Sequence, residues 1–340
     1  MDIQLNTAYS FCQQGRRDYQ EDSRYPDTDR IPGNQRFFIV CDGVGGCDKG
    51  EVASQTVCQS MAKAMAVIGT DFTSDFTNQH FHKVLDAAYN ALDKKANDDN
   101  RDMGTTMTFV CFHAGGCTMA HIGDSRIYQV RPGEGIIYRS DDHSLVNSMV
   151  HNGMLTPDEA ENHPQNNVIT RYMESVEADQ NRCTATVMWT EDVKAGDYFL
   201  LCTDGVLHCI SDDELQLLLL SDKSDEEKMK ELAGICLDSE DNNTAWLISI
   251  QSVTPTEEAD SDNDATESEA TKRLTMKTRQ QEEIESVQAT SYTITKIIKK
   301  LKTFIKVKNA KNGKPQIEHN IFNLFHFINV LSFLIILVIV

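Results

Sequence analysis

Apolar and polar positions alternate in short blocks along the first 253 residues, and the blocks predict a mixture of strands and helices. Short apolar runs bounded by Gly, Asp or Asn are typical of buried strands. Gly115 and Gly116, between two such runs, predict a tight hairpin. The predicted strands are Phe37–Cys41, Met107–Phe112, Cys117–Ile122, Thr184–Trp189, Tyr198–Cys202 and Ala245–Ile250.

Two longer segments, Glu51–Ile68 and Gln79–Asn97, carry apolar residues three and four positions apart, which predicts amphipathic helices. A further helix is expected after Ser211, because Glu214 three positions later completes the pattern of a capping box. The two long helices follow each other between strands. This order favours an α+β fold with mixed layers over a doubly wound parallel sheet.

The composition changes twice along the chain. Residues 1–253 contain the apolar runs and predict one folded domain. Residues 254–291 are polar and acidic and have too few apolar side chains to offset the chain entropy, so we expect a disordered linker. The remaining residues are first basic and then apolar.

Two segments of the C-terminal region predict contact with a membrane. Residues 292–314 contain eight lysines with apolar residues at helical spacing between them, a basic amphipathic pattern suited to an anionic membrane surface. A solvated charged helix is the alternative. Residues 321–340 carry no charged side chain and reach the length of about 20 residues that spans a bilayer. With the lysines before it, this stretch predicts a tail anchor that holds the domain in the cytoplasm at the cytoplasmic membrane. A buried helix or a pair of strands is the alternative.

The charge and the cysteines exclude some classes of function. A net charge of −20 disfavours a nucleic-acid partner, because the phosphate backbone is repelled. The ten cysteines form no CxxC pair, so neither a zinc site nor a redox motif is predicted, and free thiols in a reducing cytosol are expected. The first residues lack the basic and apolar regions of a secretory signal.

Four aspartates lie at ends of predicted core strands: Asp42, Asp124 and Asp204 follow strands, and Asp241 shortly precedes the last one. Carboxylates gathered at one sheet edge repel each other, and hard divalent cations such as Mg²⁺ or Mn²⁺ remove the conflict. Glycines after Asp42 and Asp204 let a main-chain carbonyl reach a metal. For each aspartate alone, a turn residue is the better interpretation. The four together raise a metal site as the second interpretation.

A guanidinium lies close in sequence to a further pair of carboxylates. Arg17 precedes Glu21 and Asp22 within the stretch 15–22. The planar fork of arginine suits bidentate recognition of phosphate. A solvated charged turn is the plainer interpretation of this stretch when it is taken alone.

Read in order, eight segments of the first 250 residues resemble the motifs of the bacterial-type, metal-dependent protein serine/threonine phosphatases of type 2C. Gly123–Arg126 matches the family's Gly-Asp-Ser-Arg motif unchanged, whereas Gln20 stands where Asn is common. The stretch from 147 to 171 is most similar to the bacterial branch. The other seven segments are Gly15–Asp22, Asp42–Gly46, Gly104–Thr106, Asp142–Leu145, Asn167–Arg171, Leu200–Val206 and Asp241–Thr244.

The resemblance implies a four-layer α-β-β-α sandwich with two central antiparallel sheets. It also implies two metal ions, Mn²⁺ or Mg²⁺, with Asp42 bridging both of them. The carbonyl of Gly43 would bind one ion, and Asp204 and Asp241 would bind the other. Two such cations lower the pKa of a shared water, and the resulting hydroxide attacks phosphorus in line. No protein nucleophile is needed.

The resemblance implies roles for four more residues. Glu21 and Asp22 would act near the metals, partly through water. Asp124, with Asp204, would hold a third and weaker ion. Arg17 would hold the substrate phosphate and, with the metals, neutralise charge on its oxygens.

One position departs from part of the family. Some relatives carry a histidine directly after the Asp-Gly pair and use it as the general acid, whereas Val44 stands here. His143 and His121 are conceivable proton donors, and neither is assigned. The identity of the proton donor is therefore left open, whereas hydrolysis is still expected.

The implied activity is hydrolysis of phosphoserine and phosphothreonine in proteins, opposing a cognate serine/threonine kinase. Inactive relatives would be expected to lose metal ligands, and Asp42, Asp204, Asp241 and Arg17 are all present. Activity is therefore favoured over the alternative, a catalytically inactive phosphatase-like module for binding or regulation. A metal phosphohydrolase acting on small phosphoesters is a weaker option.

Overall fold

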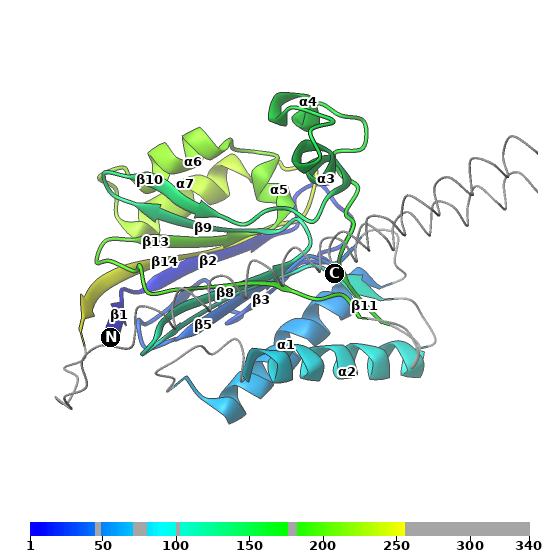
Figure 1. The fold of residues 1–340 in the computed structure, drawn as a ribbon, viewed down its shortest axis with the longest axis horizontal. Coiled ribbons are helices and arrows are strands. Elements are labelled where there is room, and N and C mark those ends of the chain that lie inside the picture. The colour runs from blue at the N-terminus through cyan, green and yellow to red at the C-terminus, as the bar shows by residue number, and fades with distance from the viewer. Residues whose placement is uncertain (45–48, 71–79, 100–102, 176–181, 256–340) are drawn as a thin grey trace, which may run out of the picture. The chain divides into compact units, whose positions relative to one another are not determined.

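The protein is described by a computed structural model that covers residues 1–44, 49–70, 80–99, 103–175 and 182–255. Two antiparallel sheets lie face to face in it, and a layer of helices covers the outer face of each (Figure 1). These layers belong to one compact unit, Met1–Glu257. The predicted four-layer α-β-β-α sandwich is confirmed.

The larger sheet has the strand order β10-β9-β13-β14-β2-β4, and β1 pairs with the far part of β14. The smaller sheet has the order β12-β8-β7-β5-β3, and β6 and β11 form a separate pair. Strands of the larger sheet are β1 (Asp2–Leu5), β2 (Ala8–Gln13), β4 (Arg30–Ile31), β9 (Arg126–Arg131), β10 (Gly135–Arg139), β13 (Tyr198–Cys202) and β14 (Asn243–Thr254). The others are β3 (Ser23–Tyr25), β5 (Phe37–Cys41), β6 (Gly104–Thr105), β7 (Met107–His113), β8 (Gly116–Ile122), β11 (Met173–Glu174) and β12 (Thr186–Thr190).

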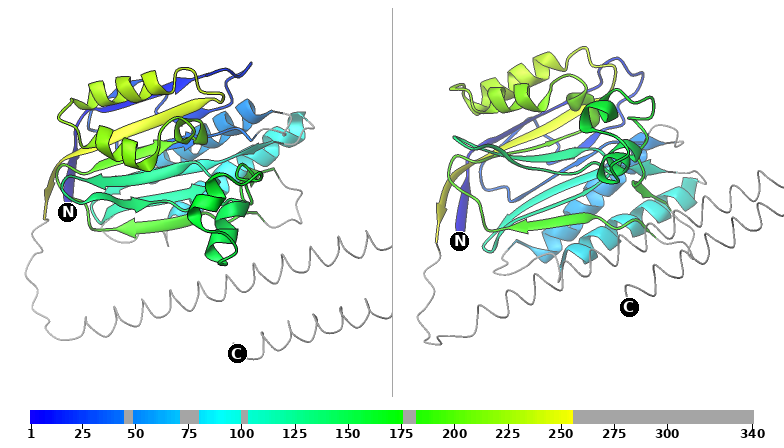
Figure 2. Two further views of the ribbon diagram at one scale, coloured as in Figure 1. Left: turned by 90° about the horizontal axis from the view of Figure 1, so that it is seen from above. Right: turned by 45° about the horizontal axis from the view of Figure 1, so that its top comes forward.

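Helices α1 (Gly50–Ile68) and α2 (His82–Asp99) cover the smaller sheet, and α5 (Asp204–Leu207), α6 (Asp212–Leu219) and α7 (Asp225–Ile235) cover the larger one. Helices α3 (Leu145–His151) and α4 (Pro157–Glu161) belong to neither layer and project at one end of the strands (Figures 1 and 2).

Strands that are apolar on both faces produce the four layers. Successive side chains of a strand point to opposite faces. In β5, Phe38 and Val40 pack between the sheets, whereas Ile39 and Cys41 pack against the helices. In β13, Phe199 and Leu201 lie between the sheets, while Leu200 and Cys202 face α5, α6 and α7.

The predicted elements are present with small shifts of their ends. Phe37–Cys41 and Tyr198–Cys202 are strands with the predicted bounds, and the last predicted strand begins earlier and ends later, as Asn243–Thr254. The hairpin is tight, but its two turn residues are Ala114 and Gly115, because His113 pairs with Gly116. The capping box of Ser211 and Glu214 is confirmed.

The predictions for the C-terminal region fall, from residue 256 on, outside the described residues. They concern the acidic linker, the basic amphipathic segment and the tail anchor. Among the helices of the described part, none has the length and apolar character needed to cross a bilayer.

Candidate metal and phosphate site

Antiparallel pairing brings two acidic segments together at one end of the smaller sheet. Ser23, the first residue of β3, pairs with Cys41, the last residue of β5. The segment before β3 therefore lies beside the segment after β5. This register places Glu21 and Asp22 next to Asp42, and the Gly43 amide donates to the carbonyl of Glu21 at 3.2 Å.

The larger sheet brings three more aspartates to the same end of the sandwich. Cys202, at the end of β13, pairs with Ala245 near the start of β14 and with Arg126 at the start of β9. Asp204 therefore lies close to Asp241, which precedes β14, and to Asp124, which precedes β9. Each candidate ligand follows or precedes a strand by only a few residues.

The electrostatics show that carboxyl groups from the two sheets meet. Burial raises the pKa of Asp42 well above its usual value, and the charges of Asp22, Asp204 and Asp124 raise it further. Contact with the Asp204 side chain also contributes to the raised pKa of Asp42. Burial raises the pKa of Asp204 as well, and the charge of Asp241 adds to that rise. These mutual effects place the carboxyl groups in one cluster.

Two further carboxyl groups, those of Asp22 and Asp124, also have raised pKa values. Burial raises the pKa of Asp22 to about 8, with added repulsion from Asp204 and Asp241 and with opposition from the hydrogen bond of Thr203. Burial also raises the pKa of Asp124 to about 8, and the charge of Asp204 contributes. Burial raises the pKa of Glu21, and the charge of Glu51 adds to this rise.

Hydroxyl and amide side chains hold the acidic segments in place. The Thr203 hydroxyl donates to Oδ2 of Asp22 at 3.0 Å. The Asp42 amide donates to Oγ1 of Thr106 at 3.0 Å, and the Thr106 amide donates to the Asp42 carbonyl at 2.8 Å. The Asn242 side chain accepts from the Glu21 amide and donates to the carbonyl of Tyr19. The sequence did not single out these threonines and this asparagine as separate site residues, because their partners lie far away in the chain.

Two glycines of the site are required by close packing of backbone. A Cβ atom on Gly43 would lie 2.5 Å from the carbonyl carbon of Gly50, at the start of α1. A Cβ atom on Gly205 would lie 2.0 Å from the carbonyl oxygen of Asn242. These contacts bring the segments after β5 and β13 closer to their neighbours than any larger residue permits.

Arg17 lies at the open side of the cluster. Its Nη2 is 2.6 Å from Oδ2 of Asp241, and its side chain remains 47% exposed. The hydrogen bond of Asp241 raises the pKa of the guanidinium further. The structure therefore places the proposed phosphate ligand beside a proposed metal ligand.

Two carboxylate oxygens, Oδ1 of Asp22 and Oδ1 of Asp204, are buried without a hydrogen-bond partner. A buried polar atom without a partner is costly, and a cation supplies one. Carboxylate oxygens are also the donors that Mg²⁺ and Mn²⁺ prefer. Within the described ranges, no group of three or more His, Cys, Asp or Glu side chains is arranged so that it could hold a metal ion. The donors fit hard cations in kind, and their assignment as ligands belongs to the proposed function.

Neither conceivable histidine donor is poised for that role. The rings of His121 and His143 stack with their centroids 4.5 Å apart. Nδ1 of His143 accepts from the Gly123 amide, and its Nε2 contacts Thr186, so both nitrogens are engaged. The sequence pattern did not indicate His208 as a site residue. It lies one helical turn after Asp204, and its charge lowers the pKa of Asp204.

Comparisons with known proteins identify the family of this chain. The sequence model of the family described as "Protein phosphatase 2C" matches residues 20–247, more than half of the 340-residue chain. A putative protein phosphatase 2C-type from Streptococcus pyogenes is 33% identical over 201 residues, which are 58% of this chain and 78% of that protein.

Solved structures show the same fold. The serine/threonine phosphatase PstP/Ppp of Mycobacterium tuberculosis is 29% identical, with a TM-score of 0.60 over 73% of this chain and 100% of that one. The catalytic domain of PstP in complex with two manganese ions gives a TM-score of 0.59 at 27% identity, over 74% of this chain and 100% of that one. The chain belongs to the protein phosphatase 2C family and is a protein serine/threonine phosphatase.

Proposed function

We propose that this phosphatase hydrolyses phosphoserine and phosphothreonine esters of proteins at the carboxylate cluster, with two divalent cations, Mn²⁺ or Mg²⁺. The observation that carries the proposal is the meeting of Asp22, Asp42, Asp124 and Asp204, whose pKa values rise through burial and, in part, through one another. The two manganese ions of the PstP structure support Mn²⁺ as the ion.

In this proposal Asp42 would contact both cations. The carbonyl of Gly43 would bind one, and Asp204 and Asp241 would bind the other. Asp124 would hold a third and weaker ion together with Asp204. We assign Glu21 and Asp22, next to Asp42, to the cations through water.

The chain's own residues bind and orient the phosphate. When bound, the cations neutralise the phosphate oxygens and lower the pKa of a water molecule between them. Arg17 presents a half-exposed guanidinium whose fork can hold two phosphate oxygens while Asp241 holds its other edge. The Thr203 bond to Asp22 and the Asn242 bond to the Glu21 amide keep both acids fixed beside Asp42.

Thiols play no part in this chemistry. Cys41 and Cys202 directly flank the site, yet both are fully buried. Burial raises the pKa of both thiols well above the usual value, which leaves them protonated and poorly nucleophilic.

Two further parts of the proposal rest on sequence alone. A cognate serine/threonine kinase would supply the phosphorylated proteins. Residues 292–314 and 321–340 would hold the catalytic domain at the cytoplasmic membrane. Deleting residues 315–340 should release the protein from the membrane fraction of a cell lysate. Full-length protein that is already found in the soluble fraction would contradict the anchor.

The catalytic proposal is tested by phosphate release from a phosphothreonine peptide by the full-length chain, in MnCl₂ and in EDTA. The Asp42→Asn variant removes the bridging carboxylate, and Asp192→Asn, an exposed acid at the other end of β9, is the matched control. We expect Mn²⁺-dependent release by the wild type and by Asp192→Asn, and none by Asp42→Asn. Folded wild-type protein that releases no phosphate in MnCl₂ would instead support the non-catalytic binding module.

A further inference from the structure

Two adjacent residues, Asp142 and His143, hold the chain on both sides of Asp124. His143 bonds to Gly123, directly before that aspartate, and Asp142 bonds to Arg126, two positions after it. Asp124 is therefore enclosed between two attachments that come from a single dipeptide, over sequence separations of 16 and 20 residues.

The attachment to Gly123 consists of two reciprocal hydrogen bonds. The Gly123 amide donates to Nδ1 of His143 at 3.1 Å, and the His143 amide donates to the Gly123 carbonyl at 2.9 Å. Because Nδ1 accepts, the ring proton resides on Nε2, which donates to Oγ1 of Thr186 at 2.9 Å. Gly123 has a φ of +111°, a conformation that residues with a side chain rarely adopt, so this position favours glycine.

The attachment to Arg126 is a bidentate ion pair. Nε and Nη2 of Arg126 each lie 2.7 Å from one carboxylate oxygen of Asp142. The two side chains are 23% and 18% exposed, so water screens the pair only in part. A planar fork on a carboxylate fixes orientation as well as distance.

The same dipeptide closes the base of the projecting segment 145–169, here called the flap, which contains α3 and α4. The amide and the hydroxyl of Thr170 donate to the His143 carbonyl at 2.6 and 2.9 Å. Asn147 donates through its side chain to the Asp142 carbonyl at 2.8 Å. The flap therefore departs from and returns to the residues that hold Asp124.

The stacked His121 ring fixes the plane of the His143 ring. The two rings are inclined by only 16°, and His121 is itself held because its Nε2 contacts the Asp141 carbonyl at 2.7 Å. With its plane fixed, Nδ1 of His143 points at the Gly123 amide. Stacking and hydrogen bonding are thus separable contributions of one side chain.

We propose that Asp142 and His143 are positioning residues that fix the turn carrying Asp124 and couple it to the base of the flap. The His143–Gly123 and Asp142–Arg126 contacts carry this role. The inference rests on the proposed function in one respect, the role of Asp124 toward a cation. The coupling between the turn that carries Asp124 and the base of the flap does not depend on a bound cation.

Two substitutions of His143 separate the hydrogen bond from the stacking. In His143→Asn, the side-chain oxygen takes the place of Nδ1 as acceptor for the Gly123 amide, and the ring is lost. In His143→Phe, the ring remains to stack on His121, and the acceptor is lost. Thr186→Val removes the partner of Nε2 and leaves the Gly123 bond in place, so it serves as the control.

The first measurement is amide hydrogen exchange of the full-length protein in EDTA, followed over residues 120–127 and 145–170. Loss of one hydrogen bond should speed exchange by roughly fivefold in both segments of His143→Phe, and His143→Asn and Thr186→Val should match the wild type. A wild-type pattern in both His143 variants would overturn the proposal. So would equal acceleration in both, or acceleration in His143→Asn alone, which would assign the effect to packing.

The second measurement is the Mn²⁺ concentration that gives half-maximal hydrolysis of the phosphothreonine peptide. We expect it to rise by about fivefold in His143→Phe and to remain at the wild-type value in His143→Asn. An unchanged requirement in His143→Phe would overturn the link to Asp124. Failure of the proposed function would show elsewhere, as activity in Asp42→Asn, and would leave the exchange result standing.

Discussion

Arg17 and Asp241 form an ion pair in which Nη2 lies 2.6 Å from Oδ2, although more than 200 residues separate them in the chain. The pairing of β2 with β14 brings them together, since Gln13 lies opposite Asn243. A guanidinium held by Asp241 at one edge is oriented before substrate arrives. The pair therefore joins phosphate binding to the acid that we assign to a cation.

We expect Arg17→Lys to lower kcat/KM for a phosphothreonine peptide by about tenfold or more, because an ammonium group cannot reproduce two parallel bonds to phosphate. Arg16→Lys is the matched control, since Arg16 pairs with the exposed Glu240. Steady-state kinetics of both variants checks this. Equal losses in the two variants would point to a general effect of positive charge at this turn.

The raised carboxyl pKa values predict how pH and metal act on stability. Asp22 and Asp124 titrate at about 8 in the folded protein, above their usual 3.8. The folded state therefore binds more protons than the unfolded state between these values, and these groups make the metal-free protein less stable as pH rises through that window. Cations require the deprotonated groups, so the rise in Tm on adding MnCl₂ should be larger at pH 8 than at pH 6.

Thermal unfolding in EDTA and in MnCl₂ at both pH values tests this. Asp124→Asn, which cannot titrate, should reduce the difference between the two pH values. A metal-induced shift in Tm that is larger at pH 6 than at pH 8 would contradict the prediction.

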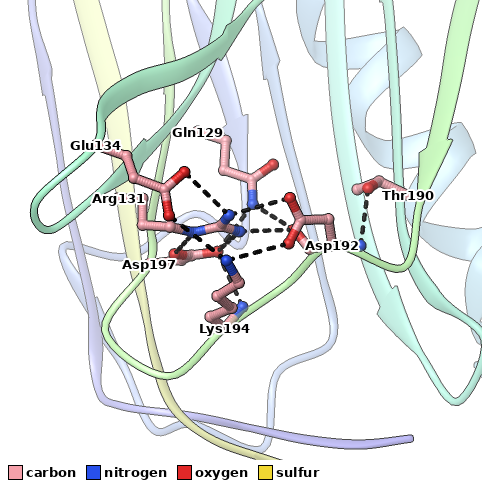
Figure 3. Close-up of polar contacts among 7 residues, drawn as sticks. All are labelled: Gln129, Arg131, Glu134, Thr190, Asp192, Lys194 and Asp197. Carbon is pink, nitrogen blue, oxygen red and sulfur yellow. Dashed lines mark hydrogen bonds and ion pairs between the residues drawn. The ribbon is translucent and has the colours of Figure 1, made fainter.

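A buried ion-pair network at the other end of β9 should affect stability and leave catalysis unchanged (Figure 3). Arg131 bonds to both carboxylate oxygens of the fully buried Asp197, at 2.8 and 2.9 Å, and Gln129 donates to the same carboxylate. Asp197→Ala removes the buried acidic partner of Arg131 and leaves the more exposed Asp192 and Glu134 as its remaining ones, so it should lower the free energy of unfolding by about 3 kcal/mol.

Asp192→Ala is the matched control for this network, because Asp192 also bonds to Arg131 but is largely exposed. Its effect should be at most about 1 kcal/mol in urea unfolding. The Mn²⁺ requirement for hydrolysis should equal that of the wild type in both variants, measured while they are folded. A changed requirement in Asp197→Ala would show that the two ends of β9 are coupled.

Substitution by alanine should have opposite effects on stability at two glycines, Gly205 and Gly234. Gly205→Ala would place a Cβ atom 2.0 Å from the Asn242 carbonyl and should disturb both folding and the position of Asp204. Gly234→Ala in α7 meets nothing within 4 Å and should stabilise the protein by about 0.5–1 kcal/mol. Urea unfolding and peptide hydrolysis of the two variants check the pair. Destabilisation by Gly234→Ala would show that the helix needs a small residue there.

The pattern of the sequence predicts best the strands that are buried on both faces. Phe37–Cys41 and Tyr198–Cys202 are uniformly apolar, and both were placed to the residue. By contrast, β9 contains Arg126, Gln129 and Arg131, whose partners come from distant segments, and its polar pattern gave no strand signal. Such residues are explained by contacts that only the folded chain makes.

The site residues also divide into those that the sequence pattern predicts and those whose partners lie in distant segments. Aspartates directly after apolar strands could be found from spacing, and the structure gathers them at one end of the sandwich. Thr203, Thr106 and Asn242 could not be assigned their partners, because hydroxyl and amide groups are common in turns. Their partners become visible only when the fold brings together the ends of strands from both sheets.

The cluster takes Asp22 and Asp42 from one sheet and Asp204 and Asp241 from the other, so the spacing between its oxygens is set by the thickness of the layer between the sheets. Phe38 and Trp246 lie in that layer with ring centroids 5.2 Å apart. Protein interiors are packed as closely as crystals, so a change in either ring would shift one sheet against the other. Residues that never touch phosphate thus serve as the spacer between the two halves of the carboxylate cluster.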